Sequence, residues 1–588
     1  MNQRKRILKI EDIKSPNDIK GLSILELENL ANSIRKLILE KCSIYGGHLS
    51  SNLGLVDLEI ALYYFFDAPK DKIFFDVGHQ CYTEKILTGR KLENLRKKDG
   101  EDGFLNMKES IYDTYEAGHS STSIGTALGY AYARDITNEK YKIISVIGDA
   151  SFSNGVVFEA INNLYNYHKQ FLIIVNDNEM AIAKTVGGFS DFLKDASCNS
   201  LNNFNLKYVG PVDGNSIDEL LKAFESIKDL KEPVLLHIKT QKGKGYKFSE
   251  NDNEGKFHYI KPFDIKTGEI IEEVDKNKIS FSNIYSSLLD NEMTKNNKLV
   301  AITPATSLGG NITNLFLNHK ERCFDVGINE EHSLLFANGL ALSKKIHPYI
   351  FIYSTFLQRA YDELIHDIAR MDTNVTIFVD RIGMVGEDGV SHQGIYDSSF
   401  LMNIPNLTIC SASNYDEAKS LFQFSLGFKK PLIIRYPNAL TDDLKNLTLN
   451  KDCKISYLEW KTLKESKNNE RCLISYGPHL DELLNLIESQ KLDVKVVNAI
   501  FLKPLNIEFL NSILDFKEII IYDPYSISGG FSMYLENELI QLGFKNKIKI
   551  ISIENKFIEK DTILGQEINN NVDVNFVIEY LKGLDNEN

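Results

Sequence analysis

Short hydrophobic runs alternate with amphipathic stretches along most of the chain. The clearest example is a β-branched run at 143–147, a helical pattern after it, and a second run at 171–175. Such runs are typical of strands buried on both faces of a parallel sheet. Between them, hydrophobic positions recur at helical spacing, namely Val156, Val157, Ala160, Ile161, Leu164 and Tyr165. The pattern predicts a βαβ unit whose two strands end at the same edge of a sheet.

The same alternation continues in three α/β blocks, for which we predict mainly parallel sheets. Polar segments without strand patterns separate the blocks, one at 247–278 and one near 441–453. We predict an N-terminal domain at 1–278, with a linker from about residue 247, a second domain at 279–450 and a third at 451–588. Further strands are expected at 299–303, 349–355, 375–380, 407–413, 431–437, 472–477, 493–501 and 518–526.

Oxygen-bearing side chains follow the two strands of the βαβ unit. Asp149 comes directly after the first run, and Asn176, Asp177 and Asn178 end the second. Because both strands end at one edge, we expect these side chains to lie close together. A carboxylate and a carboxamide suit Mg²⁺, which keeps positions for phosphate oxygens. The pattern predicts a magnesium site for a phosphorylated cofactor, the alternative being an ordinary Rossmann-like unit with polar loops.

Three histidine- and glycine-rich turns punctuate the first block, around His48, His79 and His119. One histidine in a turn more often caps or packs than catalyses, but three together are harder to explain that way. The serine- and threonine-rich segment 120–123 then precedes a helix of small residues. Its hydroxyls and backbone amides favour a diphosphate site, with a plain helix cap as the alternative.

In the second block, two acids stand side by side at Glu330 and Glu331 after an extended segment. Adjacent residues of an extended chain point to opposite faces, so only one can face a given ligand. Two solvated acids at a strand end are the alternative. The segment 353–367 predicts an amphipathic helix carrying Arg359, with Phe356 ahead of it to stack on a ring or to join the core.

Arginines end two strands of the second block, at Arg381 and Arg435. Two guanidinium groups at the ligand-binding edge predict a phosphate clamp, although either alone could be a surface ion pair. A glycine-rich loop after Arg381 also carries Asp388 and His392.

Composition narrows the class of protein. The formal net charge of −14 over 588 residues argues against nucleic-acid binding. No hydrophobic run reaches the length of a membrane span, so we expect a cytoplasmic protein that does not enter a membrane. The seven cysteines are scattered without a CxxC pair, which indicates reduced thiols rather than disulfides or zinc ligands.

Together these motifs resemble the 1-deoxy-D-xylulose-5-phosphate synthase family of transketolase-like thiamine diphosphate enzymes. The resemblance runs from about Gly21 into the final block and rests on FDVGHQCYTEKILTGR, EAGHSSTSIGTALG, VIGDASFSNGVVFEAINN with NDNEM, YSTFLQRAYDE and DRIGMVGEDGVSHQG. It implies a transketolase-like α/β fold, thiamine diphosphate, Mg²⁺ and a homodimer. It also implies condensation of pyruvate, after decarboxylation, with D-glyceraldehyde 3-phosphate.

At matching positions the resemblance implies roles for single residues. Mg²⁺ would be bound by Asp149, Asn178 and the Met180 carbonyl, and Glu330 would share a proton with the aminopyrimidine ring. Further cofactor contacts implied are His79, Gly118, Ser120, Ser121, Ala150, Ser151, Lys242, His258 and Phe356. Proton transfer would fall to His48, Asp388 and His392, and substrate contacts to Tyr353, Arg359, Arg381 and Arg435.

The chain departs from the family pattern in three places. The segment after Gly188 is short, Ala150 replaces a glycine, and Glu331 stands where glutamine is common. The short segment puts in doubt whether this part of the chain can close over the site as a lid. Alanine at position 150 is tolerated if its φ is negative. A transketolase, another thiamine-dependent carboligase and a non-catalytic paralogue are the competing interpretations.

Overall fold

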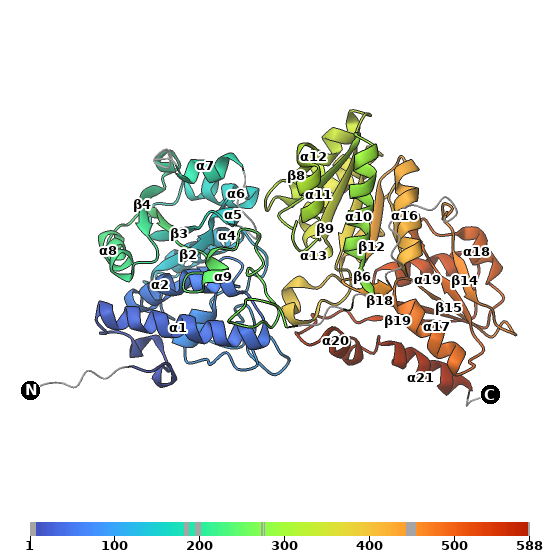
Figure 1. Ribbon diagram of the computed structural model, residues 1–588, viewed down its shortest axis with the longest axis horizontal. Helices are drawn as coiled ribbons and strands as arrows, with labels where there is room; N and C mark the ends of the chain where they lie inside the picture. Colours follow the sequence, from blue (N-terminus) through green and yellow to red (C-terminus); the bar gives the residue numbers. More distant parts are fainter. Residues whose placement is uncertain are drawn as a thin grey trace, which may run out of the picture. The chain divides into compact units, whose positions relative to one another are not determined.

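The computed structural model describes residues 8–180, 187–194, 201–271, 275, 277–442 and 454–585. The chain forms two compact units, Met1–Glu273 and Val274–Asn588 (Figure 1). Both are α/β units built mainly on parallel strands. Within the described ranges, no helix is long and apolar enough to cross a membrane.

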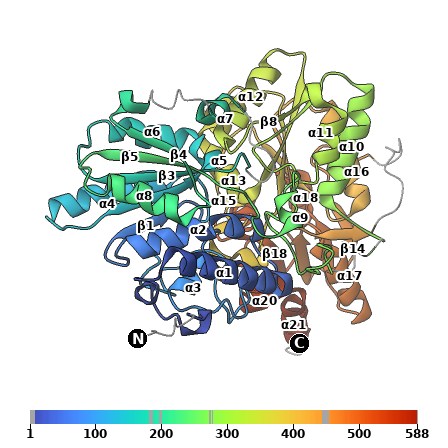
Figure 2. The same ribbon diagram turned by 60° about the vertical axis from the view of Figure 1, so that its left-hand side comes forward.

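The first unit contains a parallel sheet of five described strands in the order β1-β2-β3-β5-β4, and Figure 2 shows β3, β5 and β4 running side by side. The predicted βαβ unit is confirmed as β2, α6 and β3. The strands are β1 (Lys72–Phe75), β2 (Ile143–Gly148), β3 (Phe171–Asp177), β4 (Lys207–Asp213) and β5 (Pro233–Lys239). The helices are α1 (Ile24–Tyr45), α2 (Leu49–Phe65), α3 (Tyr82–Leu87), α4 (Ser123–Ile136), α5 (Asp149–Phe152), α6 (Gly155–Leu164), α7 (Gly188–Lys194), α8 (Ile217–Ile227) and α9 (Lys247–Glu250).

Both faces of this sheet are buried, which explains why its strands are continuously hydrophobic. Ile144 and Val146 of β2 pack in the core formed with α1, α2 and α8. Ile143 and Ile147 point to the other face and pack in the core formed with α4 and α6. Figure 1 shows α1 and α2 covering the first of these faces.

The segment 251–263, predicted as part of a linker, instead packs against the first unit. Ile260 forms an isolated β-bridge with Gly47, with N···O distances of 2.8 and 3.0 Å. The approach requires glycine at the end of α1, because a Cβ on Gly46 would lie 2.8 Å from the Ile260 carbonyl oxygen. The Ser50 amide also donates to the Phe257 carbonyl. These contacts bring His258 beside the first unit's histidines.

The second unit contains two larger sheets, in the orders β17-β11-β12-β10-β9-β7-β8 and β14-β16-β15-β18-β19 among the described strands. The strands are β6 (Lys278–Ser280), β7 (Leu299–Thr303), β8 (Cys323–Asp325), β9 (His347–Tyr353), β10 (Thr376–Asp380), β11 (Thr408–Ser411), β12 (Leu432–Tyr436), β13 (Leu440–Asp442), β14 (Lys461–Lys464), β15 (Arg471–Ser475), β16 (Lys495–Asn498), β17 (Phe501–Lys503), β18 (Glu518–Ile527) and β19 (Lys547–Ile553). The helices are α10 (Phe281–Lys295), α11 (Thr313–Asn318), α12 (Glu330–Leu342), α13 (Ser354–Leu357), α14 (Tyr361–Glu363), α15 (Asp397–Leu401), α16 (Tyr415–Gly427), α17 (His479–Ser489), α18 (Ile507–Ser512), α19 (Phe531–Gln541), α20 (Ile563–Asn569) and α21 (Val574–Asp585).

The predicted second and third domains share one core. Strand β17 leaves the third block and pairs antiparallel with β11 at the edge of the seven-stranded sheet. Ile302 of the second block and Ile474 of the third belong to the same hydrophobic cluster. The division near residue 450 therefore separates two sheets but not two compact units. The amphipathic helix predicted at 353–367 is also broken, since it consists of α13, α14, a 3₁₀ turn and a π-helical turn at Leu364–Ala369.

Candidate active site

The carboxyl ends of β2 and β3 lie side by side in the first unit. Gly148 of β2 pairs in register with Asn176 of β3, so Asp149 and Asn178 follow neighbouring strands, as predicted. Asp149 is buried at the start of α5, and the Asn178 side-chain oxygen accepts a hydrogen bond of 3.0 Å from the Met180 amide. The described residues hold no cluster of three His, Cys, Asp or Glu side chains able to bind a metal. The predicted set differs in kind, because it joins one carboxylate to an amide and a backbone carbonyl.

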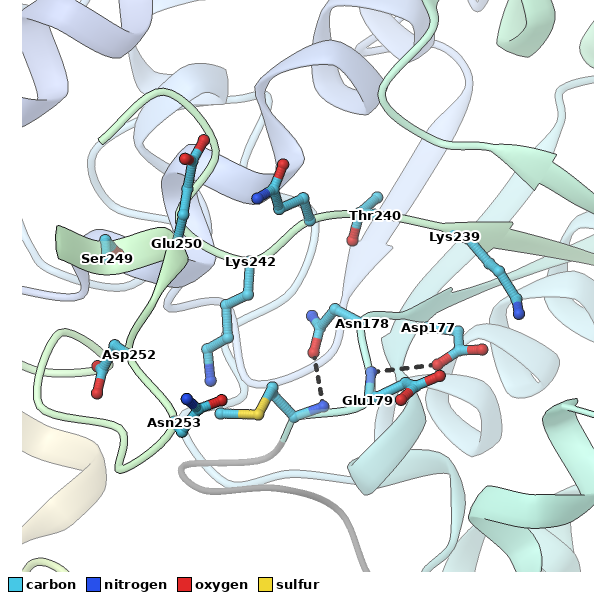
Figure 3. A pocket seen from close by; sticks show the side chains of 12 residues that line it. Asp177, Asn178, Glu179, Lys239, Thr240, Lys242, Ser249, Glu250, Asp252 and Asn253 are labelled. Carbon is cyan, nitrogen blue, oxygen red and sulfur yellow. Dashed lines mark hydrogen bonds between the residues drawn. The ribbon is translucent and has the colours of Figure 1, made fainter. Parts of the chain in front are cut away.

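A pocket of about 440 Å³ opens at this edge. Figure 3 shows the Lys242 side chain extending into it, between Asn178 on one side and Asp252 on the other. Burial lowers the pKa of Lys242 to about 8, opposed by the negative charge of Asp149. Burial and the charge of Asp177 raise the pKa of Asp149 to about 7. A cation beside Asp149 and an anion beside Lys242 would favour the charged forms of both groups, so this edge fits a metal ion with a phosphorylated ligand.

Three predicted residues form a histidine cluster. The ring centroids of His48 and His79 are 5.0 Å apart, and those of His48 and His258 are 5.7 Å apart. The His79 ring nitrogen Nε2 lies 3.1 Å from the Ser51 hydroxyl. Burial lowers the pKa of His258 well below its usual value, and the Lys242 charge lowers it further. His258 is therefore neutral at neutral pH, with one ring nitrogen able to donate a hydrogen bond and the other able to accept one.

The start of α4 already holds an anion from the protein itself. The amides of Ser121 and Ser123 donate to the Asp76 carboxylate at 2.7 and 3.1 Å. Thr122, the residue before the helix, makes no side-chain capping bond. The prediction that the amides of segment 120–123 are available to a diphosphate is therefore wrong for Ser121 and Ser123, because a buried carboxylate accepts their hydrogen bonds. Burial raises the pKa of Asp76, and the two amide bonds oppose that rise.

Backbone strain concentrates beside Asp76. Val77 has φ 63° and Ser121 has φ 76°, values that β-branched and other non-glycine residues rarely adopt. The Gly118 amide donates to the Val77 carbonyl at 2.8 Å and ties the two turns together. Ser121 Oγ donates to the Ser151 carbonyl at 2.9 Å and lies 3.2 Å from Ser120 Oγ. The strained turns thus connect the ends of β1 and β2, which is typical of a pre-organised site.

Ala150 does not disturb this arrangement. It lies inside the short helix α5, where φ is negative, and its carbonyl accepts hydrogen bonds from the Ser153 amide and hydroxyl. The condition under which alanine can replace glycine is therefore met. The shortened segment follows Gly188, and its residues 195–200 lie outside the described part of the chain.

Glu330 is the first residue of α12, and only 2% of its surface is exposed. Burial raises the pKa of Glu330 to about 7, and the Arg359 guanidinium, 3.8 Å from Oε2, opposes the rise. Oε2 has no hydrogen-bond partner among the described residues. Glu331 is half-buried on the next helical position. The expectation that Glu330 and Glu331 lie in an extended segment is wrong, because both are helical. Adjacent residues of a helix also point in different directions, and it is Glu330 that faces inward.

An aromatic and cationic group surrounds the end of β9. The rings of Tyr353 and Phe356 stack with centroids 5.5 Å apart, and His392 meets Phe356 edge-on at 6.1 Å. The Arg381 guanidinium lies 4.0 Å from the Tyr353 ring centroid, and Arg381 has φ 61°. Burial raises the pKa of Tyr353 to about 12, with Arg381 lowering it and Asp388 among the acids that raise it. The structure therefore brings these five predicted residues together.

Arg435 is not available as half of a phosphate clamp. Its side chain is fully buried and its Nε and Nη2 donate to both oxygens of Asp397, at 2.6 and 2.8 Å. Nη1 donates to the Tyr476 hydroxyl at 3.1 Å. The predicted substrate role is corrected here, since the planar fork that would grip a phosphate already grips a carboxylate.

Comparison with known proteins then decides the family. A model described as 1-deoxy-D-xylulose-5-phosphate synthase matches residues 10–202 and 196–240, and one for the transketolase pyrimidine-binding domain matches 277–442. A 1-deoxy-D-xylulose-5-phosphate synthase of Listeria monocytogenes is 40% identical and covers 88% of this chain and 88% of its own. One of Clostridium tetani is 36% identical over 92% of this chain and 95% of its own. The chain belongs to the 1-deoxy-D-xylulose-5-phosphate synthase family.

Membership makes the protein a thiamine-diphosphate-dependent transferase that uses Mg²⁺. The transketolase-like α/β fold predicted from the motifs is also confirmed. The synthase carries its candidate residues in two groups, one at the β2–β3 edge of the first unit and one around α12 and β9 of the second.

Three residues that hold candidate side chains in place were not singled out from the sequence. Asp76 directly follows β1, and Asp397 is the first residue of α15, after a tyrosine. Gly309 leaves room for Tyr353, because a Cβ there would lie 1.7 Å from the tyrosine hydroxyl. An acid directly after a hydrophobic strand was a usable signal for Asp76, whereas nothing in the sequence alone marks the other two.

Proposed function

We propose that the chain catalyses the condensation of pyruvate with D-glyceraldehyde 3-phosphate, giving 1-deoxy-D-xylulose 5-phosphate and CO₂. This is a step that supplies isoprenoid, thiamine and pyridoxal precursors. One observation carries the proposal: a chain of this family holds a buried glutamate, Glu330, with a pKa near neutrality and one oxygen that accepts no hydrogen bond from the described residues. A thiamine enzyme needs a carboxyl group of that kind.

The first unit is suited to the diphosphate and metal end of the cofactor. Asp149 and Asn178 would bind Mg²⁺ with the Met180 carbonyl, and Lys242 would approach the diphosphate. The neighbouring rings of His79 and His258 would line the same region. The serines at 120, 121 and 151 would also line it, and Ser121 is hydrogen-bonded to Ser151. When bound, thiamine diphosphate supplies an electron sink for the electron pair of the carbon–carbon bond that breaks as pyruvate loses CO₂.

In the second unit, Glu330 would hold the proton shared with ring nitrogen N1′ of the aminopyrimidine. A pKa near 7 lets the carboxyl group give or take that proton at neutral pH. Arg359, at 3.8 Å, would position the carboxyl group rather than contact substrate. Phe356 would stack on the pyrimidine ring.

The acceptor aldehyde and its phosphate would be held by Tyr353 and Arg381. Asp388 and His392 would orient the hydroxyl groups or move protons, with His48 as a further proton carrier. The His392 ring nitrogen Nδ1 lies 2.8 Å from the Ser391 hydroxyl, which orients the imidazole. Arg435 has no part in this proposal.

We also propose that the enzyme is a homodimer of the cytoplasm. Exposed hydrophobic side chains gather on α4 and α6, where Ile136 is 78% exposed and Tyr132 and Phe158 are also exposed. A second copy would cover this surface. Sedimentation of wild type and Ile136→Glu checks this, and a monomeric wild type would contradict it.

The test of function is CO₂ release from pyruvate by the purified protein with thiamine diphosphate and Mg²⁺, with and without D-glyceraldehyde 3-phosphate. Product is identified by mass. We expect acceptor-stimulated CO₂ together with a pentulose phosphate. CO₂ without stimulation would indicate another carboligase. Transfer of a two-carbon ketol unit between sugars, without CO₂, would indicate a transketolase.

A further inference from the structure

The second unit contains a pocket at the amino ends of the strands of its seven-stranded sheet. This edge is opposite to the carboxyl edge that carries Tyr353 and Arg381. The volume of the pocket is about 460 Å³, and its lining includes residues that precede β7, β9 and β10 and the residues that follow α12. None of the candidate active-site residues lines it. It is therefore a separate site, to which the proposed reaction assigns no role.

The pocket is positively charged on a protein whose formal net charge is −14. Lys298, Lys344, Lys345 and Lys429 line it, and none of them lies within 4 Å of a carboxylate in the described part of the chain. Asp372 is the acid among the lining residues, and it lies 3.8 Å from Lys430. Four amines without carboxylate partners around one cavity favour a multivalent anion.

Helix stability explains only part of this charge. Lys344 and Lys345 follow α12, and positive charges near the carboxyl-terminal end of a helix stabilise it. Lys298 precedes β7 and Lys429 follows α16, so they come from other elements. The remaining wall mixes polar and apolar side chains, the apolar ones coming from residues such as Leu342, Ile346 and Met371. Among the polar ones, Asn374 has a buried side-chain oxygen without a hydrogen bond, and the His347 ring nitrogen Nε2 lies 2.9 Å from the Thr376 hydroxyl.

Three elements run from this pocket to the candidate active site. Helix α12 ends at the pocket and begins with Glu330, a distance of about 20 Å at 1.5 Å per residue. Strand β9 begins with His347 and ends with Tyr353. Strand β10 begins after Asn374 and ends directly before Arg381. A ligand that fixes these ends acts on the rigid elements that carry the proposed catalytic groups.

We propose that this pocket binds a phosphate-class polyanion and that binding is coupled to Glu330 through α12. The binding itself does not depend on the proposed function, whereas the catalytic meaning of the coupling rests on it. Lysine ammonium groups are strong, mobile point charges, which suit phosphate oxygens in several orientations. By linkage, if the anion changes the affinity for a ligand that contacts Glu330, that ligand changes the affinity for the anion by the same factor.

The test is hydrogen–deuterium exchange on the full chain, without thiamine diphosphate, with and without inorganic pyrophosphate. We expect peptides around 342–347 and 371–374 to exchange at least about 5-fold more slowly, and the peptide beginning at Glu330 to slow with them. The first unit's pocket around Lys242 is read from its own peptides, so binding there is not mistaken for binding here.

The matched variants are the double substitution Lys344→Gln with Lys345→Gln, and Lys491→Gln as control. Lys491 follows α17 with φ 58°, the same value as Lys344 after α12, but does not line the pocket. The double variant should lose the protection and the control should keep it. Unprotected pocket peptides in wild type, or equal protection in the double variant, would overturn the site. Protection that stops short of Glu330 would overturn the coupling.

Discussion

The β2–β3 edge of the first unit and the β9–β10–β12 edge of the second are both carboxyl edges of parallel sheets, yet they treat charge differently. At the first edge, Asp149 and Lys242 are buried and their pKa values shift toward the neutral forms. At the second, Arg435 grips Asp397 and Arg381 lies over Tyr353. The first edge is thus suited to a charged ligand. At the second edge, many of the charged side chains are already paired with other side chains of the protein.

Glu330 differs from these paired groups at the second edge. It is buried and faces Arg359 at 3.8 Å, beyond hydrogen-bond distance. Burial raises the pKa of this carboxyl group to about 7, and the charge of Arg359 opposes the rise only in part. The difference teaches that a strand-end arginine can be structural, while a buried acid without a close partner is the better indicator of chemistry.

The largest effect is expected from Glu330→Gln. The amide cannot exchange a proton with the cofactor, so CO₂ release from pyruvate should fall on the order of 10²–10⁴-fold, with far-ultraviolet circular dichroism unchanged. Glu331→Gln is the matched control and should keep activity within a few-fold. Near-normal turnover of the Glu330 variant would remove the central assignment.

Arg435→Met tests whether the second edge is internally paired. Removing one partner of a fully buried ion pair should lower the free energy of unfolding by about 3–5 kcal/mol, measured by urea denaturation. Adding Asp397→Leu should restore much of that loss. If Arg435→Met were fully stable and only raised the KM for the aldehyde phosphate, the clamp prediction would be right and the correction wrong.

Asp149→Asn tests the opposite property of the first edge. Loss of the carboxylate should weaken Mg²⁺-dependent thiamine diphosphate binding on the order of 100-fold, as measured by titration calorimetry. Glu179→Gln is the control, because Glu179 lines the same pocket with an exposed carboxylate. Equal weakening by both substitutions would indicate a general charge effect in place of metal ligation.

The smallest effect concerns pH and stability. The folded-state pKa of Glu330 is about 7 and its ordinary value is 4.5, so the folded state holds the proton more tightly. The stability this contributes is fully present below about pH 4.5 and is lost as the pH rises through 7. From pH 5 to pH 8, the free energy of unfolding of wild type should therefore fall on the order of 1–3 kcal/mol more than that of Glu330→Gln. Denaturation of both proteins at the two pH values measures the difference, and parallel curves would contradict it.

Local pattern was sufficient for much of the architecture. The run at 299–303 is β7 residue for residue, and β10 and β12 lie within the predicted runs, because β-branched residues buried on both faces leave few alternatives to a parallel strand. The adjacency of Asp149 and Asn178 followed from βαβ geometry alone. The motifs around them were enough to recognise the family.

Tertiary structure decided what local pattern could not express. Asp76 takes the amides at the start of α4, Asp397 takes Arg435, and the segment with His258 packs on α1 instead of linking domains. Each outcome depends on a partner far away in sequence. The neutral-range pKa values of Glu330 and Asp149 likewise arise from burial, a property of the folded chain and not of the residue. The sequence by itself determined which groups stand at the strand ends, and the fold determined which of them already have partners.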